Sequence, residues 1–246
     1  MSTTIAGSRG RRGAAYHVLT PPNRYPSRLA GWPGTVVFKL ATPRTGTARF
    51  GQYLLELAPS GGCGDAIDPG FEHVVLVQEG APLLDGRELA TGAFAYIPPG
   101  AGLALTNPDG APSATVVWVK RRYESAAGHD QAGALRGTLG DLPEVLTPSG
   151  VLRRELLPPD DPAFDFNMSL MTFPPGVDLG MVEVHDEEHG LLMTAGAGCY
   201  HLDGDDHELV AGDFVYMAPY CPQFFRPHGA TDAQYLLYKD VFRDGF

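Results

Sequence analysis

The sequence predicts an all-β protein built from two similar halves, and three observations support this prediction. The 246 residues include 31 Gly, 22 Pro, 12 Phe and 10 Tyr, a composition that favours many short strands joined by tight turns. Several segments of the first half recur in the second half, as expected of an internal repeat. No helical periodicity of apolar residues surrounds the polar stretch Glu183–His189. Each half therefore resembles a small barrel or jelly roll of short strands.

The internal repeat is clearest in two pairs of segments. Phe71–Gly80 matches Glu187–Gly196, and in both the His stands seven residues before the Gly, which gives an offset of 189 − 73 = 116. Gly92–Pro99 matches Gly212–Pro219 at an offset of 212 − 92 = 120. The four additional residues fall in the turn around Asp203–Asp206, where insertions are tolerated. The chain therefore contains two homologous halves of about a hundred residues each.

The repeat divides the chain into four parts. We expect an irregular N-terminal arm at residues 1–45, an N-terminal barrel at 46–123, a connector at 124–150 and a C-terminal barrel at 151–246. The connector is rich in Ala and Gly, and we expect one short helix near Leu135. The arm is expected to pack across the first barrel or a neighbouring subunit.

Charge and composition exclude several classes of function. The formal net charge of −11 argues against nucleic acid or an anionic membrane as a partner, because both need basic surface. No apolar run is long enough for a membrane span, and the start lacks the apolar region of a secretory signal. The Arg- and Ser-containing start leaves a transit peptide open. Three cysteines without a CxxC motif predict no disulfide framework and fit a reducing cytosol.

A polar stretch in the second half holds three candidate metal ligands. Glu183, His185 and His189 have the same parity, so their side chains can point to one side of an extended backbone. β-Branched residues flank Glu183 and a Pro-Pro-Gly sequence lies upstream, which favours strand, short acidic loop and strand over a zincin-like helix. A solvated acidic loop is the alternative.

The repeat indicates which half can hold a metal. At the offset of 116, the first two candidate ligands correspond to Ile67 and Pro69, whereas His189 corresponds to His73. The first half therefore keeps one of the three ligands. We expect His73 to be a hydrogen-bonded core or rim histidine.

A fourth ligand is expected after Gly212. At the offset of 120, Gln223 corresponds to Leu103, which lies in a stretch from Gly92 to Asn107. The spacing of that stretch resembles the second motif of the cupin superfamily, G-x5-P-x-G-x2-H-x3-N, with Leu103 in place of the His. Gln223 therefore stands at a ligand position. This resemblance implies a bicupin, with two tandem cupin (jelly-roll) barrels in one chain.

The ligand set narrows the resemblance to one family. The four candidate ligands and two further residues resemble the pattern of the (S)-ureidoglycine aminohydrolases; the six residues are Glu183, His185, His189, Gln223, Tyr235 and Lys239. The spacings 223 − 189 = 34 and 239 − 223 = 16 agree with that pattern, and the similarity covers nearly the whole chain. The resemblance implies hydrolysis of (S)-ureidoglycine to (S)-ureidoglycolate and ammonia in the breakdown of allantoin, with manganese as the metal.

The predicted ligands and their neighbours suggest roles in this chemistry. Two imidazoles, a carboxylate and an amide carbonyl suit a six-coordinate divalent ion, with Mn²⁺ preferred and Fe²⁺, Ni²⁺ or Zn²⁺ possible. Lys239, beside the bound cation, is the candidate for proton transfer. Tyr235, Tyr200 and Glu183 are expected to contact the small-molecule substrate, the two tyrosines through its carboxylate.

Two other classes of function stay open at this point. An Fe²⁺-dependent cupin dioxygenase would use the same barrel with O₂, although Gln223 in place of a third imidazole and the nearby Lys239 argue against it. A non-catalytic bicupin would bind a small acid without releasing ammonia. The Pro-rich N-terminus could serve as an intersubunit arm, so we expect a homo-oligomer whose number of subunits is open. The lack of a disulfide framework leads us to expect a cytoplasmic location.

Overall fold

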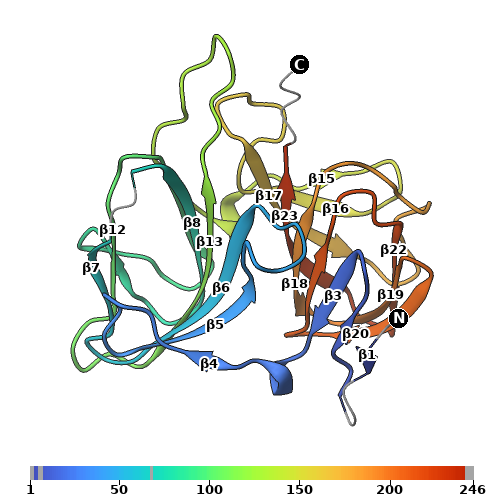
Figure 1. Ribbon diagram of the computed structural model, residues 1–246, viewed down its shortest axis with the longest axis horizontal. Helices are drawn as coiled ribbons and strands as arrows, with labels where there is room; N and C mark the ends of the chain where they lie inside the picture. The colour runs from blue at the N-terminus through green and yellow to red at the C-terminus, as the bar shows by residue number, and fades with distance from the viewer. Residues whose placement is uncertain (1–2, 5–7, 67–68, 242–246) are drawn as a thin grey trace. The chain divides into compact units, whose positions relative to one another are not determined.

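The computed structural model describes residues 3–4, 8–66 and 69–241 (Figure 1). Within these residues all regular elements are strands except two short 3-10 helices, η1 (Pro21–Asn23) and η2 (Leu139–Asp141). The predicted all-β class is therefore confirmed. No helix in the described part of the chain has the length and apolar character that a membrane span requires.

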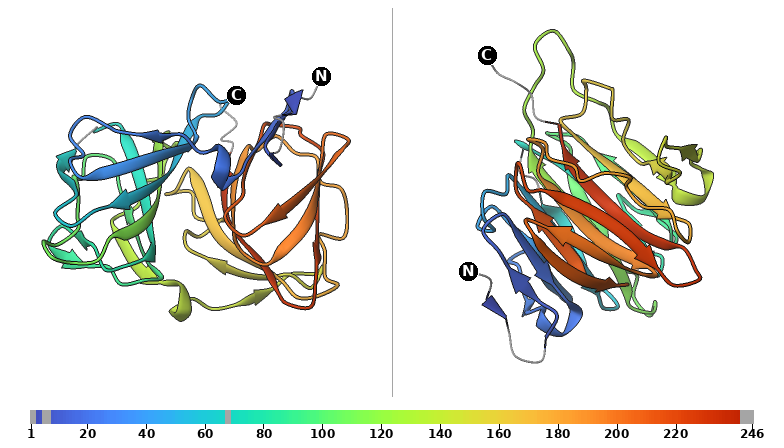
Figure 2. Two further views of the ribbon diagram at one scale, coloured as in Figure 1. Left: turned by 90° about the horizontal axis from the view of Figure 1, so that it is seen from below. Right: turned by 90° about the vertical axis from the view of Figure 1, so that its right-hand side faces the viewer.

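The chain forms two compact units, which we call the N-terminal barrel and the C-terminal barrel. The N-terminal barrel comprises Tyr25–Thr45 and Arg49–Leu142. The C-terminal barrel comprises Met1–Arg24, Gly46–Ala48 and Pro143–Phe246. In Figure 2 the strands of each unit curve around that unit's own interior.

The N-terminal barrel contains a seven-stranded and a four-stranded sheet. Its strands are β4 (Pro26–Ser27), β5 (Thr35–Ala41), β6 (Phe50–Leu57), β7 (Gly62–Ala66), β8 (Phe71–Glu79), β9 (Leu83–Leu84), β10 (Arg87–Glu88), β11 (Ala93–Ile97), β12 (Leu103–Thr106), β13 (Ala114–Arg122) and β14 (Leu135–Thr138). The strand order is β14-β11-β8-β13-β6-β5-β4 in the larger sheet and β10-β9-β12-β7 in the smaller sheet. Apolar side chains from both sheets fill the space between them.

The C-terminal barrel contains a nine-stranded and a three-stranded sheet. Its strands are β1 (Thr3–Thr4), β2 (Arg11–Arg12), β3 (Tyr16–Leu19), β15 (Val145–Leu146), β16 (Leu152–Glu155), β17 (Phe166–Phe173), β18 (His189–Ala195), β19 (Ala197–Leu202), β20 (Asp205–Val210), β21 (Phe214–Met217), β22 (Gln223–His228) and β23 (Ala233–Asp240). The strand order is β1-β2-β3-β21-β18-β23-β17-β16-β15 in the larger sheet and β20-β19-β22 in the smaller sheet.

An aromatic cluster joins the two sheets of the C-terminal barrel. Phe173 from β17, Phe225 from β22 and Tyr235 from β23 have ring centroids 4.9 to 5.5 Å apart. All three side chains are almost fully buried. Burying rings of this size stabilises the barrel through loss of apolar surface from water and through favourable ring contacts. The cluster fixes the floor above which the polar residues of this barrel lie.

The repeat found in the sequence is reproduced in the strand register. In the N-terminal barrel, Lys120 of β13 pairs with His73 of β8. In the C-terminal barrel, Lys239 of β23 pairs with His189 of β18. Both barrels therefore place a lysine beside a histidine on adjacent antiparallel strands.

The segments outside the expected barrels contribute strands to them. Residues 1–45 are not an irregular arm, because β3 pairs with β21 of the C-terminal barrel and β5 pairs with β6 of the N-terminal barrel. The connector contributes β14, which pairs with β11. The helix expected near Leu135 is instead this strand, followed by η2. Strands of four residues carry too short a pattern to be distinguished from a loop.

The repeat glycine at position 196 provides a test of the fold. Gly196 has a φ of 68°, and a Cβ added there would lie 2.5 Å from the carbonyl oxygen of Asp232. Gly204 has a φ of 89°, but an added Cβ would have no atom within 4 Å. We expect Gly196→Ala to lower the free energy of unfolding by about 2 kcal/mol more than Gly204→Ala, because only Gly196→Ala adds a backbone overlap to the cost of a left-handed residue. Urea denaturation measures both losses, and equal losses would contradict this account.

Candidate metal and substrate site

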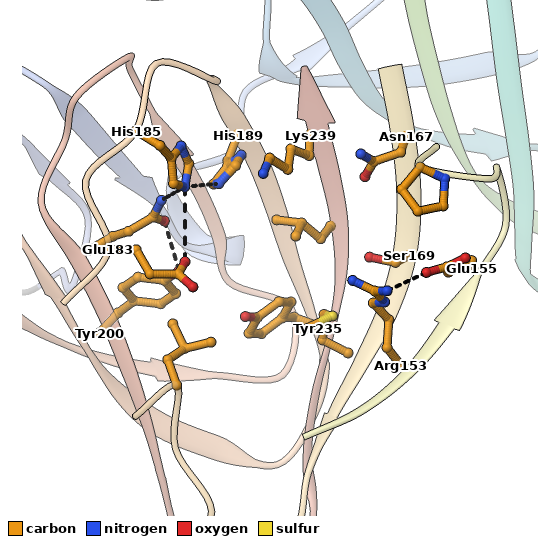
Figure 3. Close-up of a pocket in the computed structure, with 15 residues that line it drawn as sticks. Arg153, Glu155, Asn167, Ser169, Glu183, His185, His189, Tyr200, Tyr235 and Lys239 are labelled. Carbon is orange, nitrogen blue, oxygen red and sulfur yellow. Dashed lines mark hydrogen bonds and ion pairs between the residues drawn. The ribbon is translucent and has the colours of Figure 1, made fainter. Parts of the chain in front are cut away.

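A cavity of about 220 Å³ lies in the C-terminal barrel (Figure 3). Every residue that the sequence analysis assigned to the site lines this cavity, namely Glu183, His185, His189, Tyr200, Gln223, Tyr235 and Lys239. These residues come from two strands of the larger sheet, two strands of the smaller sheet and the loop that precedes β18. The fold thus brings together residues that are up to 56 positions apart in the sequence (239 − 183 = 56).

The larger sheet supplies one wall of the cavity. Strand alternation puts Tyr235, Leu237 and Lys239 on the same face of β23, and all three line the cavity. Lys239 is flanked by His189 on β18 and by Asn167 on β17. The ammonium group therefore comes from the strand next to one of the predicted ligands.

A clasp between the loop and β22 supplies the facing wall. Glu183 and Gln223 form an isolated antiparallel bridge, in which each backbone N–H donates to the other residue's carbonyl, at 2.8 and 3.0 Å. The His185 carbonyl accepts a hydrogen bond from the N–H of Tyr220 at 2.7 Å.

The expected order of strand, loop and strand is realised in part. His189 begins β18, but Glu183 makes a single bridge and His185 lies in the loop. The flanking Val182 and Val184 are exposed, so no apolar face draws this segment into a sheet.

Three polar side chains converge around the Nε2 atom of His185. This atom lies 2.9 Å from the side-chain nitrogen of Gln223 and 3.3 Å from Nε2 of His189. Oε2 of Glu183 lies 4.0 Å away. Among the described residues, no three His, Cys, Asp or Glu side chains already surround one point. The Glu183 carboxylate lies 4.0 Å from the His185 nitrogen, and Gln223 contributes an amide.

The contacts made by the Nδ1 atoms of the two histidines leave their Nε2 lone pairs facing each other. Nδ1 of His189 lies 2.9 Å from the carbonyl oxygen of Glu188; this oxygen can only accept, so Nδ1 carries the proton. Burial, the largest cause, lowers the pKa of His189 to about 3, which keeps the ring neutral. Nδ1 of His185 lies 2.9 Å from Oε2 of Glu187, although outside hydrogen-bond geometry. A carboxylate oxygen at this distance also favours the proton on Nδ1.

The donor set fits a divalent cation. The two Nε2 atoms lie 3.3 Å apart, so their lone pairs repel each other, and a cation between them would remove the repulsion. Gln223 can add its amide oxygen, because a half turn of the amide exchanges the oxygen and nitrogen positions. The hydroxyl of Tyr200, which now donates to Oε1 of Gln223 at 3.2 Å, would then accept from the amide nitrogen. Nitrogen and oxygen donors without thiolate suit first-row divalent metals.

The floor of the cavity carries two tyrosine hydroxyls. Tyr200 and Tyr235 are each 2% exposed, which leaves little water around either ring. Burial, the largest cause, raises the pKa of both hydroxyls above the usual value for tyrosine. Both groups therefore stay protonated at neutral pH and can donate hydrogen bonds to a ligand.

Glu187 joins the predicted proton donor to a predicted ligand, and the sequence analysis did not assign it to the site. Its Oε1 lies 2.9 Å from Nζ of Lys239, and its Oε2 lies 2.9 Å from Nδ1 of His185. Burial alone would raise the pKa of Glu187, but the ion pair with Lys239 outweighs it and lowers the pKa. The carboxylate is therefore ionised. The signals in the sequence were the parity that Glu187 shares with Glu183, His185 and His189, and the acidic character of the loop.

Aromatic side chains occupy the matching space in the N-terminal barrel. Trp118 pairs with Tyr53 there, as Leu237 pairs with Ser169 in the C-terminal barrel. The Trp118 ring centroid lies 4.9 Å from that of Tyr53 and 5.0 Å from that of Trp32. The smaller pair, Leu237 and Ser169, lines the cavity instead. The difference in side-chain volume at these two positions accounts for a filled interior in one barrel and a cavity in the other.

His73 is the counterpart of the predicted ligand His189, and it is part of this core. His73 is 4% exposed, and its Nδ1 accepts a hydrogen bond from Nε1 of Trp118 at 3.2 Å. The expectation of a hydrogen-bonded core histidine is confirmed. Ile67, the counterpart of Glu183, lies outside the described residues.

Comparison with known proteins identifies close relatives. No family model matches the chain. The (S)-ureidoglycine aminohydrolase of Arabidopsis thaliana is 36% identical over 233 residues, which cover 92% of this chain and 76% of the relative. The (S)-ureidoglycine aminohydrolase of Escherichia coli (strain K12) is 29% identical over 237 residues, which cover 93% of this chain and 89% of the relative.

Solved structures share the two-barrel architecture. The crystal structure of protein YlbA from E. coli matches with a TM-score of 0.82 and 27% identity, covering 95% of this chain and 93% of that chain. A variant of Bacillus subtilis oxalate decarboxylase matches with a TM-score of 0.65 and 10% identity, covering 92% and 78%. This second likeness concerns the fold alone. The expected bicupin fold is confirmed.

Replacement of Glu187 tests the link between the loop and the metal donors. Glu187→Ala should weaken the binding of a divalent cation, with Mn²⁺ as the probe, about tenfold, because a carboxylate that contacts a ligating histidine orients its ring. Asp186→Ala is the matched control, since it removes the same charge from the same loop, and we expect it to keep the affinity. Equilibrium dialysis with metal analysis measures both constants. Equal weakening in the two variants would assign the effect to loop charge and not to the contact with His185.

Proposed function

The chain belongs to the (S)-ureidoglycine aminohydrolase family, and we propose that it hydrolyses (S)-ureidoglycine to (S)-ureidoglycolate and ammonia in ureide breakdown. The observation that carries this proposal is the meeting of four metal-donor groups and Lys239 in one small cavity. In this reaction a C–O bond to water replaces a C–N bond. The attacking water loses one proton, and the departing nitrogen gains one.

The proposed metal donors are Glu183, His185, His189 and Gln223. Neutral imidazoles, a carboxylate and an amide oxygen support a divalent first-row ion, and the resemblance to the family implies Mn²⁺. When bound, such a cation would polarise the substrate as a Lewis acid and orient its carboxylate and amine.

Lys239 is proposed to move the protons. The lysine pairs with His189, and Glu187 holds its Nζ at 2.9 Å from Oε1. The ammonium form can give a proton to the departing nitrogen, and the resulting amine can take one from the attacking water. The two transfers balance, so Lys239 ends each turnover in its starting form.

The tyrosines and Glu183 are proposed to contact the substrate. The hydroxyls of Tyr200 and Tyr235 line the cavity floor and can donate to the substrate carboxylate. The side chain of Glu183 is 40% exposed, which leaves one carboxylate oxygen open to the substrate amine. Manganese as the metal, self-association and a cytoplasmic location stay predictions from the sequence.

Ammonia release tests the proposed reaction. Ureidoglycine would be generated in situ from allantoate, and ammonia and the chirality of the product would be followed with Mn²⁺-loaded protein. We expect faster release with a single enantiomer of ureidoglycolate, and loss of both effects in Glu183→Ala. The variant is needed because aminals also decompose unaided. No acceleration by the metal-loaded protein would contradict the proposal, and oxygen uptake would indicate a dioxygenase instead.

Replacement of Lys239 tests its role separately from metal binding. Lys239→Ala should lower turnover by about 100- to 10,000-fold, the usual contribution of a positioned acid–base group, with an unchanged metal content. Lys120→Ala is the matched control, because Lys120 holds the same register in the N-terminal barrel, and it should keep full turnover. A Lys239→Ala protein that turns over at the wild-type rate with its metal bound would exclude this role.

A further inference from the structure

One wall of the cavity carries polar side chains that the proposed proton transfers and metal binding do not use. Arg153 and Glu155 lie on the same face of β16 and form an ion pair, with Nη2 and Oε1 2.5 Å apart. Ser169 and Asn167 lie on the same face of the neighbouring β17, and Ser169 pairs with Glu155. All four line the cavity across from the metal donors (Figure 3). We call these four residues the polar wall.

The polar wall is neutral in sum but rich in hydrogen-bonding groups. The Arg153 guanidinium has donors beyond those directed at Glu155, and the carboxylate has further lone pairs. Within the described part of the chain, Nε of Arg153 is buried without a hydrogen-bond partner, and Ser169, which is only 5% exposed, lines the cavity. A buried donor that is left unpaired costs free energy. A bound ligand with its own acceptors would satisfy such donors.

The N-terminal barrel lacks this polar wall. Val37 stands in the position of Arg153, since it pairs with Leu55 as Arg153 pairs with Met171. Val37 is fully buried within the core. The Arg153 and Glu155 side chains are instead 36% and 27% exposed, and both line the cavity. The charged pair occurs in the barrel with the cavity, which points to a role in ligand binding.

We infer that the polar wall binds the uncharged ureido group of the substrate and selects it over other N-acyl groups, an inference that rests on the proposed function. A ureido group presents one carbonyl acceptor and several N–H donors. Arg153 can donate to the carbonyl, and Glu155 and Asn167 can accept from the N–H groups. Glu155 would repel the substrate carboxylate, which the metal and Lys239 attract to the other end of the cavity.

Two stable probes separate the ureido group from the rest of the substrate. N-Carbamoylglycine and N-acetylglycine share a carboxylate and an amide, and differ in a terminal NH₂ or CH₃. Calorimetric titration of the Mn²⁺-loaded wild type should give about tenfold tighter binding of N-carbamoylglycine, the usual effect of one hydrogen bond to a charged group. Glu155→Met should remove most of this preference with an unchanged metal content, because the terminal NH₂ loses its charged acceptor. Arg153→Met should instead weaken both probes, through the carbonyl that they share.

The neighbouring ion pair offers the matched control. Arg154 lies on the opposite face of β16 and pairs with Glu144 at 3.2 Å, and the Glu144 side chain is 38% exposed against 27% for Glu155. Glu144→Met should therefore keep the preference. The double variant Arg153→Met/Glu155→Met removes both charges together and so leaves no unpaired charge in the cavity. It should also lose the preference.

The outcomes separate the inference from the proposed function. Equal binding of the two probes by the wild type, or an equal preference in Glu155→Met and Glu144→Met, would overturn the inference. Equal weakening of both probes by Glu155→Met would show that Glu155 does not contact the terminal NH₂, which also overturns it. A retained preference in a protein that does not accelerate ammonia release would overturn the proposed function and leave the ureido-binding wall standing.

Discussion

The register of three adjacent strands is the constraint on which the site depends. Strand β23 pairs with β17 on one side and β18 on the other, so Lys239 is fixed between Asn167 and His189. Neighbouring strands lie about 4.8 Å apart, and a slip of one residue would turn every one of these side chains to the opposite face. The aromatic cluster below the cavity opposes such a slip, because it buries Phe173 and Tyr235 from the same two strands.

The two barrels show how one architecture can either fill its interior or leave it open. With the same strand pairing, Trp118 and Tyr53 pack ring against ring in the N-terminal barrel, while Leu237 and Ser169 leave space in the C-terminal barrel. The filled barrel gains apolar burial. The open barrel gives up part of this contribution and holds charged and polar groups whose burial has a cost. The candidate site therefore lies in the barrel that keeps a cavity in its interior.

Sequence reasoning predicted the residues that the repeat or a parity pattern marks. Gln223 follows from the offset to Leu103, and the core position of His73 follows from the loss of its partner ligands. Glu187 has the same parity as the predicted ligands, but only the fold shows its contact with Lys239. Arg153 carries no such mark, because its place in the cavity wall becomes visible only once β16 lies beside β17. The same limit applies to β3 and β14, because a strand of four residues becomes recognisable only beside the sheet that it joins.

The clasp between Glu183 and Gln223 shows why the ligands need the whole barrel and not one motif. Glu183 lies on a loop with exposed neighbours, and two backbone hydrogen bonds to Gln223 hold it against β22. His189, by contrast, is buried in β18. A loop and a buried strand therefore meet at the cavity. Because His189 is buried in β18, we expect adjustment to a cation to come from the loop carrying Glu183 and His185, and the ion pair between Glu187 and Lys239 to limit that adjustment.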